Sequence, residues 1–401
     1  MILLKNLKKM VIIAIFLLTF FVGNSQEKWK QYTPHNSGLS TFHVTDFVID
    51  SSNNFWFCLF GGGITKYDGN NWITYDRSDG LAGDTIVDVI IDSKKNLWFA
   101  SIGGGLSMFD GSNFVNYNTT NGLPNNVLND LVEDLNGNIW IATVGSGVSR
   151  FDGNTFTTFT ENDGLADKNV FALACDSNNN IWIGTENGVS KFNNNIFTNY
   201  TTADGLSGND INSITFDNEK NIWFNTVNGA TKFNGHTWTS YDKSNGLCDN
   251  WIWVTFQDSR GNYWFGSNYK GVTKFNGNIF KDYSVTDGLT HICIKQILED
   301  NEGNIWFATL GGISMYQYSS SINNLEKLKF EIITNNNKIK IKGIDNQHHS
   351  FKINLFTTSG KLVLEDIFEG DSYQCKLIPG IYIYSIFEND KYYNGKIIIK
   401  N

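Results

Sequence analysis

A tryptophan recurs seven times along this chain, at an almost fixed interval of 41 or 42 residues. A Gly-Leu pair keeps the same interval, and short apolar runs bounded by glycine, asparagine and aspartate turns lie between the two landmarks. The tryptophans are Trp56, Trp98, Trp140, Trp182, Trp223, Trp264 and Trp306. A period near forty residues, built from short strands and glycine turns, is typical of β-sheets repeated around an axis. The repeat predicts an all-β fold, a seven-bladed β-propeller.

The unit at residues 205–241 shows how each blade is expected to form. Four short apolar segments, at 210–216, 222–226, 230–233 and 237–241, are separated by turns that contain Asn-Gly pairs or an aspartate. Four strands joined by hairpins make one antiparallel meander sheet. The third turn carries Asp-Gly, Asn-Gly or Asn-Asn, which suit the positive φ angles of a type I′ hairpin.

An aspartate stands six residues before each of the seven tryptophans, at the same turn of the repeat. These are Asp50, Asp92, Asp134, Asp176, Asp217, Asp258 and Asp300. A carboxylate there can accept hydrogen bonds from the backbone of the first hairpin. Calcium is the alternative, but each turn lacks the further carboxylates that such a site needs. The tryptophans are expected to pack between blades rather than to form a stacking platform for ligands.

The ends of the repeat region predict how the ring closes. The last unit ends after Met315 and Tyr316 without a fourth strand, whereas residues 29–32 repeat the fourth-strand pattern. We therefore expect residues 29–33 to supply the outer strand of blade seven, which would cover an exposed sheet edge. The propeller would span residues 26–318.

Composition and the amino terminus indicate the compartment. The formal net charge is −9, and without a basic stripe this argues against nucleic acid or an anionic membrane as partner. Three early lysines, the apolar run Met10–Val22 and the small residues Gly23 and Ser25 predict a signal peptide over 1–25. A retained membrane anchor is the alternative, but thirteen apolar residues are short for a span. Five cysteines without a paired spacing predict no disulfide framework.

The repeat also resembles a known family. The pattern over about residues 29–318 is Gly-Leu, an apolar strand, Asp-x-x-Gly/Asn-Asn-Ile-Trp-Ile/Phe-x-Thr and then Gly-Val-Ser-Lys-Phe-Asp/Asn-Gly. This pattern resembles the two-component regulator propeller repeat. The resemblance implies periplasmic sensor propellers, often two in tandem, fused to a membrane-bound histidine kinase. Because one ring and no kinase region can be read in this sequence, signalling by phosphotransfer is not expected of it.

The composition changes after Tyr318. A linker at 319–326 precedes a Lys- and Ile-rich region, 327–401, whose alternating pattern predicts a small β-sandwich with strands near 351–356, 361–364, 381–387 and 396–400. The motifs Ser-Gly-Lys-Leu-Val at 359–363, Pro-Gly-Ile-Tyr at 379–382 and Lys-Ile-Ile-Ile-Lys at 396–400 resemble the carboxy-terminal sorting domain of the type IX secretion system. The resemblance implies an address read by the secretion machinery. An ordinary accessory sandwich remains the alternative.

Candidate binding residues are the positions that vary between otherwise similar blades. In a propeller, the segments leading into each first strand share one face with the loops between the second and third strands, near the central channel. Trp251, Trp253 and Tyr269 of blade six could form an aromatic surface for a sugar ring or an apolar side chain, or simply pack that blade. The full candidate set is His43, Asn169, Asp210, Asn212, Trp251, Trp253, Tyr269, His291 and Lys295.

Two histidines raise the question of catalysis. His43 and His291 belong to blades one and seven, which become neighbours in a closed ring, with Asp46 and Lys295 close in sequence. A metal site or an acid–base pair is one interpretation and solvated loop histidines are the other. Enzyme motifs are otherwise missing, so no catalytic residue, metal or cofactor is assigned.

The sequence thus predicts a secreted or cell-surface monomer that binds an extracellular glycan or peptide at its loop face, without catalysis. The alternatives are a protein–protein scaffold, and a lyase or hydrolase that uses the His43/His291 face.

Overall fold

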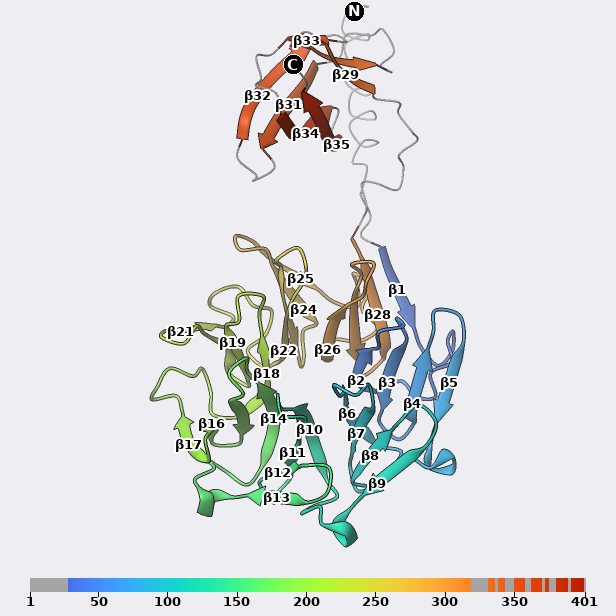
Figure 1. The fold of residues 1–401 in the computed structure, drawn as a ribbon, viewed down its shortest axis with the longest axis vertical. Helices are drawn as coiled ribbons and strands as arrows, with labels where there is room; N and C mark the ends of the chain where they lie inside the picture. The colour runs from blue at the N-terminus through green and yellow to red at the C-terminus, as the bar shows by residue number, and fades with distance from the viewer. Residues whose placement is uncertain are drawn as a thin grey trace, which may run out of the picture. The chain divides into compact units, whose positions relative to one another are not determined.

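The computed structural model describes residues 28–318 without a break, and beyond them the segments 331–335, 338–342, 350–357, 362–369, 372–374, 380–388 and 391–399. Residues 28–318 form seven four-stranded antiparallel sheets arranged around a central axis (Figure 1). The predicted seven-bladed propeller is confirmed.

The first three blades consist of the following strands. Blade 1 has β2 (Val44–Ile49), β3 (Phe55–Leu59), β4 (Gly63–Tyr67) and β5 (Trp72–Tyr75). Blade 2 has β6 (Ile86–Ile91), β7 (Leu97–Ser101), β8 (Leu106–Phe109) and β9 (Phe114–Tyr117). Blade 3 has β10 (Leu128–Glu133), β11 (Ile139–Thr143), β12 (Val148–Phe151) and β13 (Phe156–Phe159). Short 3-10 helices follow the outer strands of these blades: η1 (Arg77–Asp79), η2 (Thr119–Asn121) and η3 (Glu161–Asp163).

The next three blades repeat the plan. Blade 4 has β14 (Val170–Cys175), β15 (Ile181–Thr185), β16 (Gly188–Asn193) and β17 (Ile196–Tyr200). Blade 5 has β18 (Ile211–Phe216), β19 (Ile222–Thr226), β20 (Gly229–Phe233) and β21 (Trp238–Tyr241). Blade 6 has β22 (Ile252–Gln257), β23 (Tyr263–Ser267), β24 (Val272–Phe275) and β25 (Phe280–Tyr283).

Blade 7 joins the two ends of the propeller. It contains β26 (Ile294–Glu299), β27 (Ile305–Thr309) and β28 (Gly312–Gln317), and its outer strand is β1 (Lys28–Tyr32). β1 is antiparallel to β28, with Trp29 opposite Tyr316. The Trp29 ring also lies 5.6 Å from Tyr283 of blade 6, centroid to centroid. The strand therefore closes the ring and packs against the preceding blade.

The repeated tryptophans pack between neighbouring blades, as predicted. Trp140 of blade 3 is buried in one cluster with Ile181, Ile183 and Phe192 of blade 4. The second strand of each blade carries this tryptophan, and in β11 every residue is buried. These clusters, one at each junction, form the core of the propeller.

The aspartates six residues earlier hold the first hairpins, also as predicted. In blade 3, Asp134 Oδ1 accepts hydrogen bonds from the backbone N–H groups of Asn136 and Asn138 at 2.9 and 3.0 Å. The other oxygen, Oδ2, accepts from Trp140 Nε1 at 3.0 Å. The same carboxylate thus fixes the turn and orients the tryptophan, which explains the constant spacing of six residues.

One glycine shows why the loops between second and third strands end in this residue. Gly271 has a φ of +92°, and a Cβ placed on it would lie 2.1 Å from the carbonyl oxygen of Tyr283. A side chain would therefore be strained in its backbone and would clash with the neighbouring strand.

Beyond the propeller, the described segments are strands of a second unit. One sheet has the order β29 (Glu331–Asn335), β30 (Lys338–Lys342), β33 (Ser372–Gln374). The other has the order β32 (Leu362–Glu369), β31 (Ser350–Thr357), β34 (Gly380–Glu388), β35 (Lys391–Ile399). These strands agree with the predicted all-β character of this region, and the sandwich itself stays a prediction. The signal peptide at 1–25 and the linker at 319–326 lie outside the described residues.

Candidate functional site

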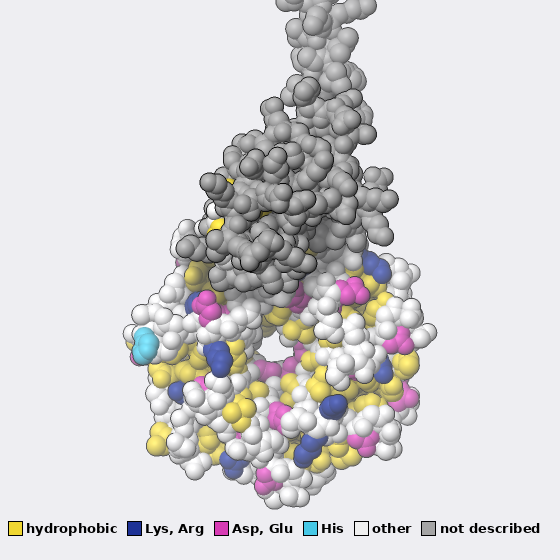
Figure 2. Space-filling view, turned by 45° about the horizontal axis from the view of Figure 1, so that its top comes forward, with side chains coloured by type: hydrophobic (Ala, Val, Ile, Leu, Met, Phe, Trp, Pro, Cys, Tyr) yellow, Lys and Arg dark blue, Asp and Glu magenta, His cyan; other side chains and the backbone are white. Residues whose placement is uncertain are grey.

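The first strands of the seven blades lie side by side around the central channel. Figure 2 shows this channel open in the middle of the ring, with acidic side chains at its rim. Every first strand has a register shift at the same place, such as the one between Val44 and Asp46 in β2. The extra residue of each bulge is Thr45, Val87, Asn129, Phe171, Asn212, Trp253 or Lys295. Bulges re-aim side chains, so these seven positions set the chemistry of the channel wall.

Polar residues at the bulges connect neighbouring blades. Asn129 Nδ2 donates to the carbonyl oxygen of Val170 at 2.7 Å, and Asn212 Nδ2 donates to that of Ile252 at 2.8 Å. Asn212, a candidate binding residue from the sequence, therefore joins blades 5 and 6 through its amide nitrogen.

The aromatic candidates of blade 6 do form one cluster. The Trp251 and Trp253 rings lie 6.1 Å apart, and Tyr269 meets Trp251 edge to face at 5.5 Å. Tyr269 is 55% exposed, whereas the two tryptophans are half-buried. Trp253 Nε1 donates to Asn268 Oδ1 at 2.8 Å, which fixes the orientation of its ring.

A lysine from blade 7 lies on this cluster. Lys295 Nζ is 3.3 Å from the centroid of the Trp253 ring, a cation–π contact across the blade junction. Burial lowers the pKa of Lys295 because it disfavours the charged ammonium. The cluster thus combines flat apolar faces with a partly desolvated amine.

The two histidines lie at the adjoining junction. His43 stacks on Phe60 at 4.9 Å between ring centroids, and His291 Nδ1 accepts a hydrogen bond from the Cys293 N–H at 3.0 Å. Burial lowers the pKa of His43, and the nearby charges of Lys295 and His291 lower it further. His43 is therefore favoured as a neutral imidazole at neutral pH.

The remaining candidates lie on blades 4 and 5. Asn169 Nδ2 donates to Glu186 Oε2 at 2.7 Å, and Asp210 is exposed just before β18. The structure thus brings Trp251, Trp253, Tyr269 and Lys295 into contact and places Asn169 and Asp210 in other sectors of the ring.

Sequence reasoning missed a row of channel carboxylates in blades 1 to 3. Asp46, Asp88 and Asp130 occupy one position of the repeat, and each Oδ2 accepts the backbone N–H of the next blade. These hydrogen bonds, to Val89, Leu131 and Leu173, are 3.0, 2.8 and 2.6 Å long. The recurrence of aspartate in three successive units was the signal that could have found them.

The protonation of this row is unusual. Burial raises the pKa of Asp130 to about 7. Burial also raises the pKa of Asp88 well above its ordinary value, and the charges of Asp130 and Asp46 on either side add to the effect. Asp88 hydrogen-bonds to both neighbours, as expected for carboxyls that share protons.

Exposed apolar side chains mark the same end of the channel as the aromatic cluster. Phe60, Ile102 and Val144 are 47%, 43% and 37% exposed. Their N–H groups bond to the carbonyl oxygens of His43, Thr85 and Val127, which lead into the first strands. This end of the channel, here called the channel mouth, therefore has two sectors. One is aromatic and cationic, at blades 6, 7 and 1, and the other is apolar, at blades 1 to 3.

Two general properties follow from the described residues. Within them, no group of three or more His, Cys, Asp or Glu side chains is arranged to hold a metal ion. No helix in the same part of the chain has the length and apolar character that a membrane crossing requires.

Four of the seven repeats match the model of a known family. The two component regulator propeller family matches residues 164–187, 205–228, 246–269 and 288–311. The matched segments belong to blades 4 to 7 of the seven-bladed ring. No curated protein matches the sequence.

Solved structures share the fold. The extracellular domain of a hybrid two component system from B. thetaiotaomicron is 18% identical with a TM-score of 0.66, over 93% of this chain and 57% of that one. PorZ, a surface component of the type-IX secretion system of Porphyromonas gingivalis, is 13% identical with a TM-score of 0.59, over 91% and 60%. Virginiamycin B lyase from Staphylococcus aureus, with quinupristin, is 14% identical with a TM-score of 0.57, over 73% and 99%. The chain spans less than two thirds of the first two structures, and at these identities the similarity concerns the fold.

Proposed function

We propose that this protein is a secreted or cell-surface propeller that binds an extracellular glycan or peptide at the channel mouth. The observation that carries the proposal is the cluster of Trp251, Trp253 and Tyr269 with Lys295 against Trp253. Aromatic faces pack on the C–H face of a sugar or on apolar side chains. A partly desolvated ammonium beside them attracts a hydroxyl, carbonyl or carboxylate oxygen of the same ligand.

A second feature of the cluster supports a polar ligand group. Within the described part of the chain, Trp251 Nε1 is buried without a hydrogen-bond partner. Buried donors are nearly always paired, so a small rearrangement that presents this N–H to a ligand acceptor would satisfy it.

Export is part of the proposal. We infer that residues 1–25 are removed as a signal peptide and that residues 327–401 direct the propeller through a type IX secretion machinery. The similarity of fold to PorZ, a surface component, and to the extracellular domain of a hybrid two component system supports an extracellular location. The mature protein would act as a monomer whose partners are a carbohydrate or peptide, or a surface protein.

The test is a screen of glycans and peptides by thermal shift, followed by titration of each hit. A ligand that binds only the folded protein raises the melting temperature by mass action. Trp253→Ala should weaken binding at least about tenfold, because it removes the ring that contacts Lys295. Phe171→Ala is the matched control, since Phe171 occupies the same bulge position in blade 4, and it should bind normally.

Other outcomes of these experiments would favour a different site or a different function. Equal loss of binding in both variants would place the site elsewhere on the ring. Absence of any hit, together with capture of a surface protein by the wild type, would favour the scaffold interpretation. Turnover of a probe that disappears in the His43→Ala, His291→Ala double variant would favour a lyase or hydrolase.

A further inference from the structure

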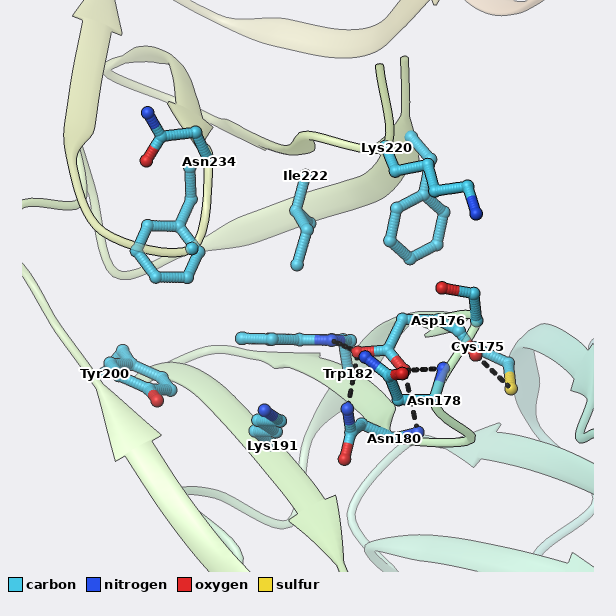
Figure 3. A pocket seen from close by; sticks show the side chains of 14 residues that line it. Cys175, Asp176, Asn178, Asn180, Trp182, Lys191, Tyr200, Lys220, Ile222 and Asn234 are labelled. Carbon is cyan, nitrogen blue, oxygen red and sulfur yellow. Dashed lines mark hydrogen bonds between the residues drawn. The ribbon is translucent and has the colours of Figure 1, made fainter. Parts of the chain in front are cut away.

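A pocket of about 440 Å³ lies between blades 4 and 5, away from the channel residues described above (Figure 3). Blade 4 contributes Asp176, Trp182 and Lys191, and blade 5 contributes Ile222 and Phe216. In Figure 3, Ile222 points from its strand toward the Trp182 ring across the open space. Phe216 is 36% exposed, whereas Trp182 and Ile222 are 2% and 7% exposed, so the accessible apolar part of the wall is the Phe216 side chain.

The three blade 4 residues form a unit that recurs in blades 1, 5 and 6, and in blade 1 it consists of Asp50, Trp56 and Lys66. Asp176 Oδ2 accepts from Trp182 Nε1 at 3.0 Å, and Lys191 Nζ lies 5.2 Å from the Trp182 ring centroid. The corresponding distances are 3.2 and 5.6 Å for Asp217, Trp223 and Lys232, and 2.9 and 5.2 Å for Asp258, Trp264 and Lys274. The Asp–Trp–Lys unit therefore has nearly the same geometry at three successive junctions.

At the junction of blades 5 and 6, a tyrosine occupies this unit. The Tyr263 hydroxyl donates to Asp217 Oδ2 at 3.0 Å and accepts from Lys232 Nζ at 3.1 Å. Its ring lies 5.1 Å from that of Trp223. The unit thus binds both the hydroxyl and the face of a phenol.

At the junction of blades 6 and 7, a second tyrosine contacts the unit from a different part of the chain, and its hydroxyl accepts from Asn262 Nδ2 at 3.0 Å. The Tyr318 hydroxyl donates to Asp258 Oδ2, and Lys274 Nζ lies 4.4 Å from the Tyr318 ring centroid. Tyr318 follows the last residue of β28 and belongs to no strand. A phenol can therefore reach this unit from the residue just after a strand as well as from the first residue of a strand.

The rings that blade 5 places near Trp182 are Phe224 and Phe233, at 5.7 and 6.3 Å between centroids, and neither carries a hydroxyl. Ile222 opens β19 as Tyr263 opens β23, and an isoleucine has no hydroxyl for Asp176 and Lys191. We propose that the pocket between blades 4 and 5 binds a tyrosine side chain of a partner polypeptide. The hydroxyl would lie between Asp176 and Lys191, and the ring against the exposed Phe216, with the 2% exposed Trp182 at the base of the pocket. This site is separate from the proposed ligand site at the channel mouth.

The test uses the full-length protein and three probes: acetyl-Gly-Tyr-Gly-amide, acetyl-Gly-Phe-Gly-amide and p-cresol, titrated by NMR. The tyrosine peptide should bind about tenfold more tightly than the phenylalanine peptide, because one hydrogen bond to a carboxylate is lost. It should also bind more tightly than p-cresol. Equal affinity for the two peptides, no binding, or a preference for free p-cresol would overturn the proposal.

Two variants borrowed from other blades locate the site. Ile222→Tyr places in blade 5 the residue that blade 6 already has, and it should fill the pocket and abolish peptide binding. Lys191→Met introduces the residue found at the equivalent Met108, and it should reduce the preference for tyrosine over phenylalanine. If Ile222→Tyr fails to fold, the preference of the Lys191→Met variant for the tyrosine peptide over the phenylalanine peptide tests the proposal. Asp152→Ala, in the exposed third hairpin of blade 3, should leave tyrosine binding unchanged, and a loss there would contradict the assignment.

Discussion

Asp88 has two carboxyl neighbours and a backbone donor, and this arrangement determines how the protein responds to pH. Its pKa and that of Asp130 are raised in the folded state, the latter to about 7. The folded protein therefore retains protons that the unfolded chain releases above pH about 4. The free energy of unfolding should fall as the pH rises through this window, up to the raised pKa values.

Asp88→Asn should remove much of this dependence. The amide nitrogen can donate to Asp46 and Asp130, and the amide oxygen can still accept from the Leu131 N–H. We expect a gain on the order of 1 kcal/mol or more in the free energy of unfolding at pH 8, and little change at pH 5. Urea denaturation at both pH values measures it, with the exposed Asp210→Asn as control. The same pH dependence in Asp88→Asn and wild type would contradict this explanation.

The blade is held by short polar motifs as well as by its apolar junctions. The hairpin aspartate of blade 3 accepts hydrogen bonds from two backbone N–H groups, from the Asn138 side chain at 2.8 Å and from Trp140 at 3.0 Å. Burial alone would raise the pKa of Asp134, but these hydrogen bonds outweigh it and lower the pKa. The anion is therefore the form that the blade requires.

Asp134→Ala should lower the free energy of unfolding by about 3 kcal/mol, since several hydrogen bonds to one carboxylate are lost and a buried indole N–H is left unpaired. Thermal and urea unfolding provide the measurement. Asp152→Ala, in the exposed third hairpin of the same blade, is the matched control and should have a much smaller effect. A similar loss of unfolding free energy in both variants would show that the hydrogen bond to Trp140 adds nothing to stability.

At the level of elements, the sequence predicted strands and hairpins because their signals are local. Asn-Gly and Asp-Gly turns, alternating apolar residues and the aspartate before each tryptophan all act within one unit. The Asp–Trp bond itself was not predicted, although its six-residue spacing was visible. The tyrosines at the junctions were not predicted either, because Tyr263 and Tyr318 contact side chains of a preceding blade that lie about 46 to 60 residues away.

The whole ring depends on β1. Trp29 contacts Tyr283 of blade 6 as well as Tyr316 of blade 7, at 5.6 and 5.1 Å between ring centroids. Without this strand, β28 becomes an open sheet edge, which is a site for pairing with another chain.

Deletion of residues 1–33 should therefore destabilise the propeller and cause association. Loss of the Trp29 contacts alone is worth about 3 kcal/mol. Light scattering after gel filtration would detect the association and calorimetry the lower melting temperature. A chain that lacks only residues 1–26 keeps β1 and should behave as the wild type. A monomeric, fully stable product of the longer deletion would refute the role given to this strand.

The candidate site was only partly predictable, because its contacts depend on how the blades are arranged around the ring. The positions that vary in an otherwise constant repeat identified Trp251, Trp253 and Lys295 as candidates. The structure places these three residues in contact. The row formed by Asp46, Asp88 and Asp130 was not predicted, because a carboxylate in an acidic sequence is usually a solvated one. Their burial depends on backbone donors of the following blade, and a linear sequence does not reveal which strands face each other across a channel.

The pairing of β1 with β28 also sets the order of events during synthesis. The strand that leaves the ribosome first has as its partner the strand that is completed last in the propeller. Contacts so distant in sequence form slowly because the intervening chain must first lose its freedom. The nascent chain therefore carries an unpaired strand for most of its translation, which gives chaperones a long interval in which to bind it.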